Sequence, residues 1–272
     1  MKRRNADLIK LTSTAVLMAL SIVLSRVANL SFYLPIGGVN SVKMGFGSIP
    51  VVICLLINGP FYGMIAGAGA DLIGGLALPT GGAYFPGFTV DAALLGLIPA
   101  VLMKAMKNQR IKELVTGFII IGFSTIGLYI TLPFLDKIKI GSFRMELTTM
   151  WRILIPSLFI LAAIVVLLIC FFISKKEKKQ FTVLDIFIVY ATRDLIITPF
   201  LAPIWLLQLY GLDYGFSYLS QLLSGAVEMP INIIVCYLLV YPISLVTKAT
   251  LASTYGDEYP IYTKVYQGKK IS

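Results

Sequence analysis

Six ionisable side chains lie inside long apolar stretches of this sequence, and they are the residues best able to bind or react. They are Arg26, Asp71, Asp91, Arg193, Asp194 and Glu228. A charge at membrane depth costs several kcal/mol unless it is paired or faces a polar cavity. These side chains therefore predict either a ligand site or structural ion pairs that fix helix register. The adjacency of Arg193 and Asp194 favours the ion-pair alternative for Asp194.

The segment PTGGAYFPGFT at residues 79–89 is the second unusual feature. It holds three glycines, two prolines and three aromatics and carries no charge. Glycine permits close backbone approach, proline stiffens the chain, and aromatic rings offer stacking surface. The segment predicts the wall or lid of a pocket for a flat ring, and the alternative is a tight re-entrant turn anchored by aromatics.

The elements that must position these residues are membrane helices. Of the 272 residues, 58% are hydrophobic and 13% are charged, and the mean hydropathy is +0.88. A span needs about 20 apolar residues, so the sequence predicts an all-α integral membrane protein. The apolar runs predict eight spans, at 11–34, 44–58, 60–78, 87–103, 114–133, 151–173, 182–209 and 216–246. The first run is too long for the core of a signal peptide and is expected to be retained as a helix.

The basic residues indicate an orientation. Of the 23 Lys and Arg residues, 16 fall into four groups of four that flank every second turn of the eight-span arrangement. The positive-inside rule then predicts that both termini are cytoplasmic, with anionic lipid as the partner of these charges rather than nucleic acid. Four segments face outside in this arrangement, at 35–43, 78–86, 134–150 and 210–216. The segment 134–150 is expected to be an ordinary solvated loop.

Small residues follow one face of the expected third helix. Gly59, Gly63 and Gly67 are spaced by four residues, and Asp71 is one step further along. Residues four apart share a helix face, so this stripe predicts close contact with a neighbouring helix.

The common motifs of hydrolases and metalloenzymes are missing from the sequence. It contains no histidine, and Cys54, Cys170 and Cys236 stand singly in expected spans, where they predict core packing. HExxH and GxSxG motifs are absent, and an intramembrane aspartyl pair of Asp71 and Asp91 would lack the flanking motif of that class. The sequence thus argues against an enzyme and predicts no cofactor and no metal.

Several strings resemble one transport family. They are ALSIVLSR (19–26), KMGFGSIP (43–50), NGPFYG (58–63), GADLIGGLALPTGGAYFPGFT (69–89), IWLLQLYG (204–211) and VEMPINI (227–233). The chain resembles the substrate-binding S components of energy-coupling factor (ECF) vitamin transporters, in particular their folate-specific branch. The resemblance covers about residues 11–104 and 182–246.

The resemblance implies a mechanism of transport. A chain of this kind captures folate or a reduced derivative outside a prokaryotic plasma membrane. It then docks onto a transmembrane coupling subunit driven by two ATPases and topples to deliver its cargo, without hydrolysing anything itself. Docking in the family uses an AxxxA element, which Ala15 and Ala19 match in spacing. Arg26 is eleven residues beyond Ala15 and would share its helix face, which conflicts with a pocket role unless the helix bends or opens.

The expected pocket combines charges with aromatic rings. A carboxylate can hold the guanidine-like edge of a pterin, and Arg or Lys can hold the carboxylates of the glutamate tail. We expect Asp91 or Glu228 to read the ring and Arg26, Lys43 or Arg193 to hold the tail. The aromatic members of the expected site are Tyr84, Phe85, Phe88 and Trp205.

Two departures from the family pattern leave alternatives open. The family has six spans, so we expect residues 1–104 and 181–246 to form its core, 105–180 to add a helix pair, and 247–272 to be a cytoplasmic tail. The Asn-Thr-x-Trp element of the family reads Ala202-Pro203-Ile204-Trp205 here, which favours another flat vitamin or precursor as an alternative cargo. A stand-alone secondary transporter is a further alternative, although the sequence lacks a convincing internal repeat.

Overall fold

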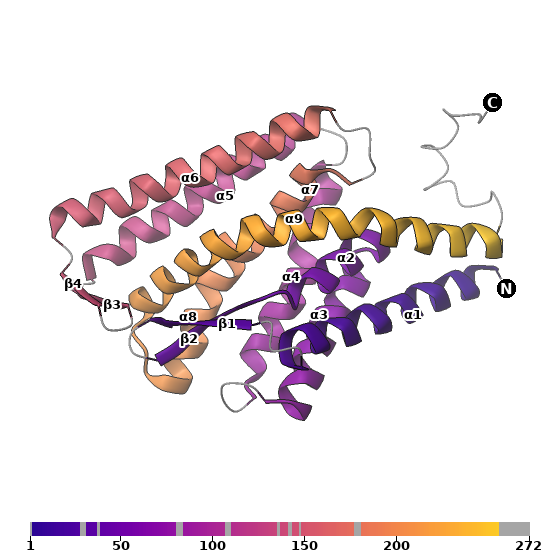
Figure 1. Cartoon of the computed structure of the whole chain (residues 1–272), viewed down its shortest axis with the longest axis horizontal. Helices are drawn as coiled ribbons and strands as arrows, with labels where there is room; N and C mark the ends of the chain where they lie inside the picture. Colours follow the sequence, from indigo (N-terminus) through magenta and orange to yellow (C-terminus); the bar gives the residue numbers. More distant parts are fainter. Residues whose placement is uncertain are drawn as a thin grey trace.

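The computed structural model describes residues 2–27, 31–36, 39–79, 84–106, 110–134, 137–140, 143–146, 148–176 and 181–255. The α-helices are α1 (Lys2–Ile22), α2 (Ser48–Asn58), α3 (Pro60–Ala77), α4 (Pro86–Met106), α5 (Arg110–Thr131), α6 (Thr149–Lys176), α7 (Val183–Thr192), α8 (Thr198–Tyr210) and α9 (Tyr214–Tyr255). They form a bundle in which the start of α1 and the end of α9 lie at one end (Figure 1). The turn between α8 and α9 lies at the other end.

Each of the eight apolar runs contains a helix, as the sequence predicts. Five described stretches are long and apolar enough to cross a bilayer, at Asp7–Arg26, Pro86–Met103, Ile111–Thr131, Thr149–Lys175 and Tyr214–Leu245. The helix α2 has only 11 residues, which is short of a full span. The chain is a membrane-embedded helical protein, while the count of eight spans and their orientation stay predictions.

A small sheet corrects the expectation of a purely helical protein. Its strands are β1 (Ser31–Ile36), β2 (Val39–Gly45), β3 (Lys137–Ile140) and β4 (Phe143–Glu146), in the order β2-β1-β3-β4. All pairs are antiparallel, and Ile36 opposite Ile140 joins the two hairpins. The sheet lies at the end of the bundle opposite the start of α1 (Figure 1).

The sheet overturns two boundaries drawn from hydropathy. Residues 31–34 belong to β1 rather than to the first helix, and much of 134–150 forms a strand hairpin rather than an ordinary loop. The alternation in Lys137–Ile140 (KIKI) and Phe143–Glu146 (FRME) is the period of a strand. Charges on alternate residues lowered the hydropathy of 134–150 and concealed this pattern.

Two π-helical turns interrupt the bundle helices, η1 (Val23–Val27) after α1 and η3 (Arg193–Ile197) between α7 and α8. In η3 the Thr198 N–H bonds to the Arg193 carbonyl five residues earlier. Pro199 follows directly, and a proline lacks the N–H that would continue the α-helical ladder. Each π turn carries an arginine, Arg26 in η1 and Arg193 in η3.

The glycine stripe of α3 packs against α4, as the sequence predicts. A Cβ added to Gly67 would lie 2.1 Å from the Ala92 carbonyl oxygen, and one on Gly96 would lie 2.2 Å from the Gly63 carbonyl carbon. Only residues without side chains allow the two backbones to approach this closely. Gly59 lies outside the contact, since a Cβ there would meet nothing within 4 Å. Asp71 continues the stripe and leads into the candidate site.

The remaining core consists of α7 and the helices around it. The side chains of α7 from Val183 to Thr192 are buried except that of Asp185, and α4, α5, α6 and α9 pack against this helix. Cys54, Cys170 and Cys236 are buried and free, as expected for core packing. Helices α5 and α6 form an antiparallel pair (Figure 1), and the assignment of 105–180 as an addition to a six-helix core stays a prediction. Helix α9 continues to Tyr255, and residues 256–272 of the expected tail lie outside the described part of the chain.

Candidate functional site

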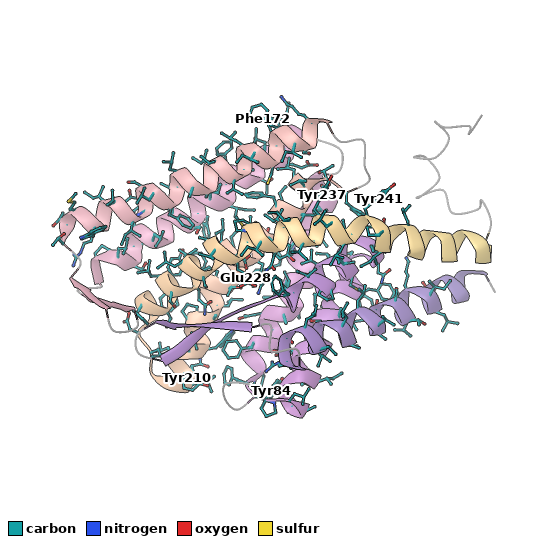
Figure 2. The ribbon with its side chains drawn as sticks, in the orientation of Figure 1. Tyr84, Phe172, Tyr210, Glu228, Tyr237 and Tyr241 are labelled. Atoms are coloured by element: carbon teal, nitrogen blue, oxygen red, sulfur yellow. The ribbon has the colours of Figure 1, made fainter. Side chains whose placement is uncertain are left out.

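The first group of polar and aromatic side chains surrounds the start of α4. We call it the loop cluster, and its members are Arg26, Asp71, Tyr84, Phe85, Phe88, Thr89, Asp91 and Trp205. They come from η1, α3, α4, α8 and the two residues before α4. Tyr84, labelled in Figure 2, lies two residues before the start of α4.

Asp71 is the centre of the polar half of this cluster. Its Oδ2 accepts a hydrogen bond of 2.7 Å from the Thr89 hydroxyl, and its Oδ1 lies 3.5 Å from Arg26 Nη2. The Tyr84 hydroxyl lies 2.9 Å from that of Thr89. One carboxylate therefore joins η1, α3 and the start of α4.

Trp205 is the centre of the aromatic half. Its indole Nε1 donates to Asp91 and lies 3.1 Å from Oδ1 and 3.2 Å from Oδ2 of that carboxylate. The Phe85 ring centroid lies 5.8 Å from that of Trp205 and 6.2 Å from that of Phe88. Because one N–H serves both oxygens, Asp91 keeps lone pairs for further donors. A carboxylate beside these rings is suited to a flat ligand with a donor-rich edge.

Gly87 makes this packing possible. A Cβ at this position would lie 2.5 Å from Trp205 Cδ2 and 2.7 Å from Phe85 Cε1. Gly75 does the same for Tyr84, because a Cβ there would lie 2.8 Å from Cδ2 of that ring. Glycines thus let the aromatic rings pack directly against backbone.

The second group lies between η3 and α9, and Figure 2 shows its member Glu228 in the middle of the bundle. We call it the core cluster, and its members are Ser48, Arg193, Asp194, Glu228 and Asn232. Arg193 Nη1 lies 3.2 Å from Glu228 Oε1, 3.3 Å from Asp194 Oδ1 and 3.2 Å from Ser48 Oγ. Asn232 donates a second hydrogen bond, of 2.9 Å, to Glu228 Oε1.

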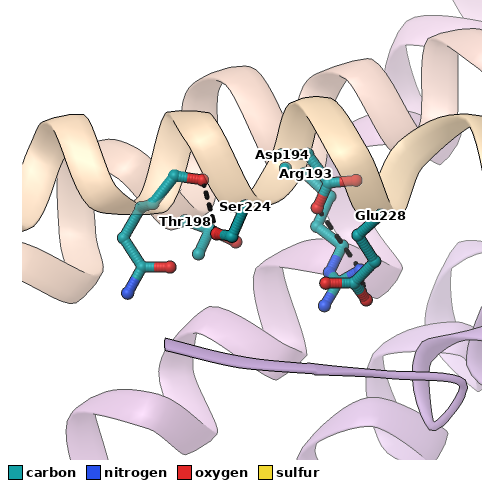
Figure 3. A pocket seen from close by; sticks show the side chains of 7 residues that line it. Arg193, Asp194, Thr198, Ser224 and Glu228 are labelled. Atoms are coloured by element: carbon teal, nitrogen blue, oxygen red, sulfur yellow. Dashed lines mark hydrogen bonds and ion pairs between the residues drawn. The ribbon is translucent and has the colours of Figure 1, made fainter. Parts of the chain in front are cut away.

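A small polar cavity of about 30 Å³ adjoins the core cluster. It is lined by Arg193, Asp194, Thr198, Gln221, Ser224, Gly225 and Glu228. Figure 3 shows the side chain of Arg193 directed toward Glu228, with Thr198 and Ser224 further along the same helices. The volume is about that of one water molecule, so this cavity is too small for a vitamin-sized ligand.

The structure thus divides the nine expected pocket residues. Arg26, Tyr84, Phe85, Phe88, Asp91 and Trp205 belong to the loop cluster, whereas Arg193 and Glu228 pair with each other in the core cluster. Lys43 lies on β2 opposite Tyr33, and its side chain is outside the described part. Asp71 and Thr89 join the loop cluster without having been assigned to the pocket from the sequence. The position of Asp71 at the end of the glycine stripe was the available signal.

The conflict between Ala15 and Arg26 is resolved by the π turn. Ala15 and Ala19 are exposed on α1, in line with Leu11 and Val23. Arg26 lies in η1, where the wider turn changes the angular position of the residues that follow α1. Its side chain is only 16% exposed and faces Asp71, so the exposed alanines and the arginine lie on different faces.

These features define the class of protein. It is a helical membrane protein, and a cluster of polar and aromatic side chains lies at the same end of the helix bundle as the sheet. A family model described as "ECF transporter, substrate-specific component" matches residues 9–144, half of the chain, and the chain belongs to this family. It is therefore a substrate-specific component of a membrane transport system. The matched range includes the loop cluster except Trp205 and also includes α5.

One relative carries a more particular name. The folate transporter FolT of Clostridium novyi (strain NT) is 39% identical to this chain over 87 residues. These residues make up 32% of this chain and 46% of the relative, so the alignment spans about half of that protein. No solved structure matches the chain.

Proposed function

We propose that this chain is the substrate-capturing subunit of an ECF-type ABC transporter and that it binds folate or a related pterin vitamin from outside the cell. The loop cluster carries the proposal, because it combines aromatic rings, a carboxylate with spare lone pairs and an arginine at one end of the bundle. The partial identity to a folate transporter supports the same ligand class. The chain delivers its cargo to a coupling subunit, and separate ATPase subunits hydrolyse ATP.

Within the pocket, Asp91 is the better candidate for reading the pterin ring. Glu228 Oε1 already accepts hydrogen bonds from Arg193 and Asn232, whereas the described partner of Asp91 is one indole N–H. Asp91 also lies beside the rings that would stack on the ligand. We assign ring recognition to Asp91 and stacking to Phe85, Phe88 and Trp205.

Arg26 is the better candidate for the glutamate tail. Arg193 contacts two carboxylates, Asp194 and Glu228, which offset its positive charge. The described carboxylate partner of Arg26 is Asp71 at 3.5 Å, a long contact that a ligand carboxylate can replace. Lys43 on the neighbouring strand remains a second candidate for the tail.

The exposed face of α1 supports the docking assignment. Ala15 and Ala19 lie there with Val16 and Leu20, which are 63% and 43% exposed. Small residues allow close approach of a partner helix. We assign this face to the coupling subunit and place both termini on the cytoplasmic side of a prokaryotic plasma membrane, with eight spans.

Mass spectrometry of small molecules released from the protein, purified in mild detergent, tests the ligand. A folate or other pterin supports the proposal. A different flat vitamin keeps the transport role and reassigns the pocket, an outcome that the Ala202-Pro203 replacement favours. A blank from cells supplied with folate contradicts the binding proposal.

Uptake measurements test the mechanism separately. Folate uptake into cells should require the coupling subunit and ATP. Uptake by this chain alone along an ion gradient would instead identify a secondary transporter and overturn the proposed coupling.

A further inference from the structure

The core cluster has an imbalance of charge. It contains one guanidinium, that of Arg193, and two carboxylates, those of Asp194 and Glu228. The side chains of Asp194 and Glu228 are 4% and 10% exposed. If both carboxylates were ionised, the cluster would carry one net negative charge inside a membrane-embedded bundle, where a charge without a partner is costly.

The imbalance is located at one atom. Glu228 Oε1 accepts hydrogen bonds from Arg193 and Asn232, and Asp194 Oδ1 contacts Arg193. Asp194 Oδ2 is buried and has no hydrogen-bond partner among the residues that the structure describes. A buried carboxylate oxygen without a hydrogen-bond donor is destabilising. This oxygen would be stabilised by a bound cation or by a bound proton.

Among the described side chains, that of Arg193 is the one cation in contact with Asp194. Besides Arg193, the titratable side chains on the flanking parts of α7 and α9 are Tyr190, Glu228 and Cys236, all buried. Helices α4 and α5 also pack against η3, and each carries one carboxylate. That of α4 is Asp91, which contacts Trp205. That of α5 is Glu113, near the start of the helix. Lys112 stands beside Glu113 at the far end of α5.

A metal ion is a poor candidate for the missing charge. Within the described part of the chain, no group of three or more His, Cys, Asp or Glu side chains is arranged to hold a metal. A proton needs only one carboxylate oxygen, and the adjoining cavity of about 30 Å³ is lined by Thr198, Gln221 and Ser224. These side chains, or one water molecule of that size, can accept a hydrogen bond from a carboxylic acid.

We infer that Asp194 is a proton-binding site, which takes one proton from solvent on Oδ2 and thereby makes the core cluster electrically neutral. Asp194 then donates a hydrogen bond into the cavity, while ionised Glu228 is the counter-charge of Arg193. This inference concerns the junction of η3 and α9 and does not depend on which vitamin the protein binds.

Substitutions that remove a charge but keep the shape test the inference. Asp194→Asn replaces a neutral acid by a neutral amide, so the unfolding temperature in detergent should stay within about 2 °C of the wild type. Glu228→Gln should lower it moderately, because Asp194 can release its proton and pair with Arg193. The double variant leaves Arg193 without an anion, so its loss should exceed the sum of the two single losses. A large loss in Asp194→Asn alone would contradict the inference, because it would show that Arg193 depends on an ionised Asp194.

Infrared spectroscopy tests the proton directly and does not require a variant to fold. Wild-type protein labelled with ¹³C in the aspartate carboxyl groups should show the carbonyl band of a protonated acid at neutral pH, displaced by the label and by D₂O. The band should be absent from Asp194→Asn. A wild-type spectrum without this carbonyl band overturns the inference. A second outcome would also overturn it: if Na⁺ stabilises the wild type relative to choline and Asp194→Asn abolishes that effect, the site binds a metal cation instead.

Discussion

The loop cluster and the core cluster use the same residue types in different surroundings. Both contain an arginine on a π turn that contacts a carboxylate from another helix. In the loop cluster the ion pair is long, at 3.5 Å, and its carboxylate is 21% exposed. In the core cluster one guanidinium contacts two nearly buried carboxylates at 3.2 and 3.3 Å. The first arrangement leaves groups for a ligand, and the second holds helices together.

The largest expected difference between the clusters is in stability. Arg193→Gln removes the counter-charge of a buried group, and breaking such a pair costs about 3–5 kcal/mol. Arg26→Gln removes a longer contact to a less buried carboxylate and should cost about 1 kcal/mol. Thermal unfolding of the two variants in the same detergent measures the difference. Equal losses would remove the distinction between a structural and a ligand-binding arginine.

The second largest effect is expected on the affinity of the loop cluster for folate. Arg26→Ala removes a charged partner of the glutamate tail, so folate affinity should fall by about 1.5–3 kcal/mol, roughly 10- to 150-fold. A pterin without the tail should bind about as well as to the wild type. Titration calorimetry with both ligands makes the comparison, and an equal loss for both would refute the assignment of Arg26 to the tail.

The aromatic half of the loop cluster should be sensitive to loss of one N–H. Trp205→Phe keeps a ring against Phe85 but deprives Asp91 of its described donor, which should cost about 1–3 kcal/mol in folate binding. Trp151→Phe is the matched control, because Trp151 lies on α6, is 38% exposed and takes no part in either cluster. If the two variants bind equally well, the contact between Trp205 and Asp91 does not organise the pocket.

The smallest effect expected concerns the packing of backbone against the rings. Gly87→Ala places a Cβ 2.5 Å from Trp205, and the resulting shift should cost about 1–2 kcal/mol of binding free energy. Gly122→Ala on α5 is the control, since a Cβ there meets nothing within 4 Å. The control should be neutral or more stable by up to about 1 kcal/mol. Unchanged ligand binding in Gly87→Ala would mean that the rings can move without affecting the site.

Much of the fold was predictable because its causes are local. Apolar runs located the helices, and the four-residue spacing of Gly63 and Gly67 correctly indicated a close helix contact. The aromatic segment at 84–88 and Trp205 were also expected in one site, and their rings do meet.

The missed features depend on contacts between distant parts of the chain. The pairing of β1 with β3 joins residues about a hundred positions apart, which no local pattern specifies. Arg193 contacts Glu228 because η3 and α9 are adjacent in space, a proximity that the sequence does not reveal. The position of Arg26 required knowledge of a π turn, which hydropathy does not encode.

The two π turns also constrain chain length. Each contains one residue more than an uninterrupted α-helix would need, so the loss of a single codon within Val23–Val27 or Arg193–Ile197 would let an ordinary helix close. Because the wide turn absorbs the extra residue, the segments on either side would keep roughly their relative orientation, and the change would be confined to the turn that carries the arginine. The widened turn that carries each arginine therefore depends on the number of residues in these two windows as well as on their types.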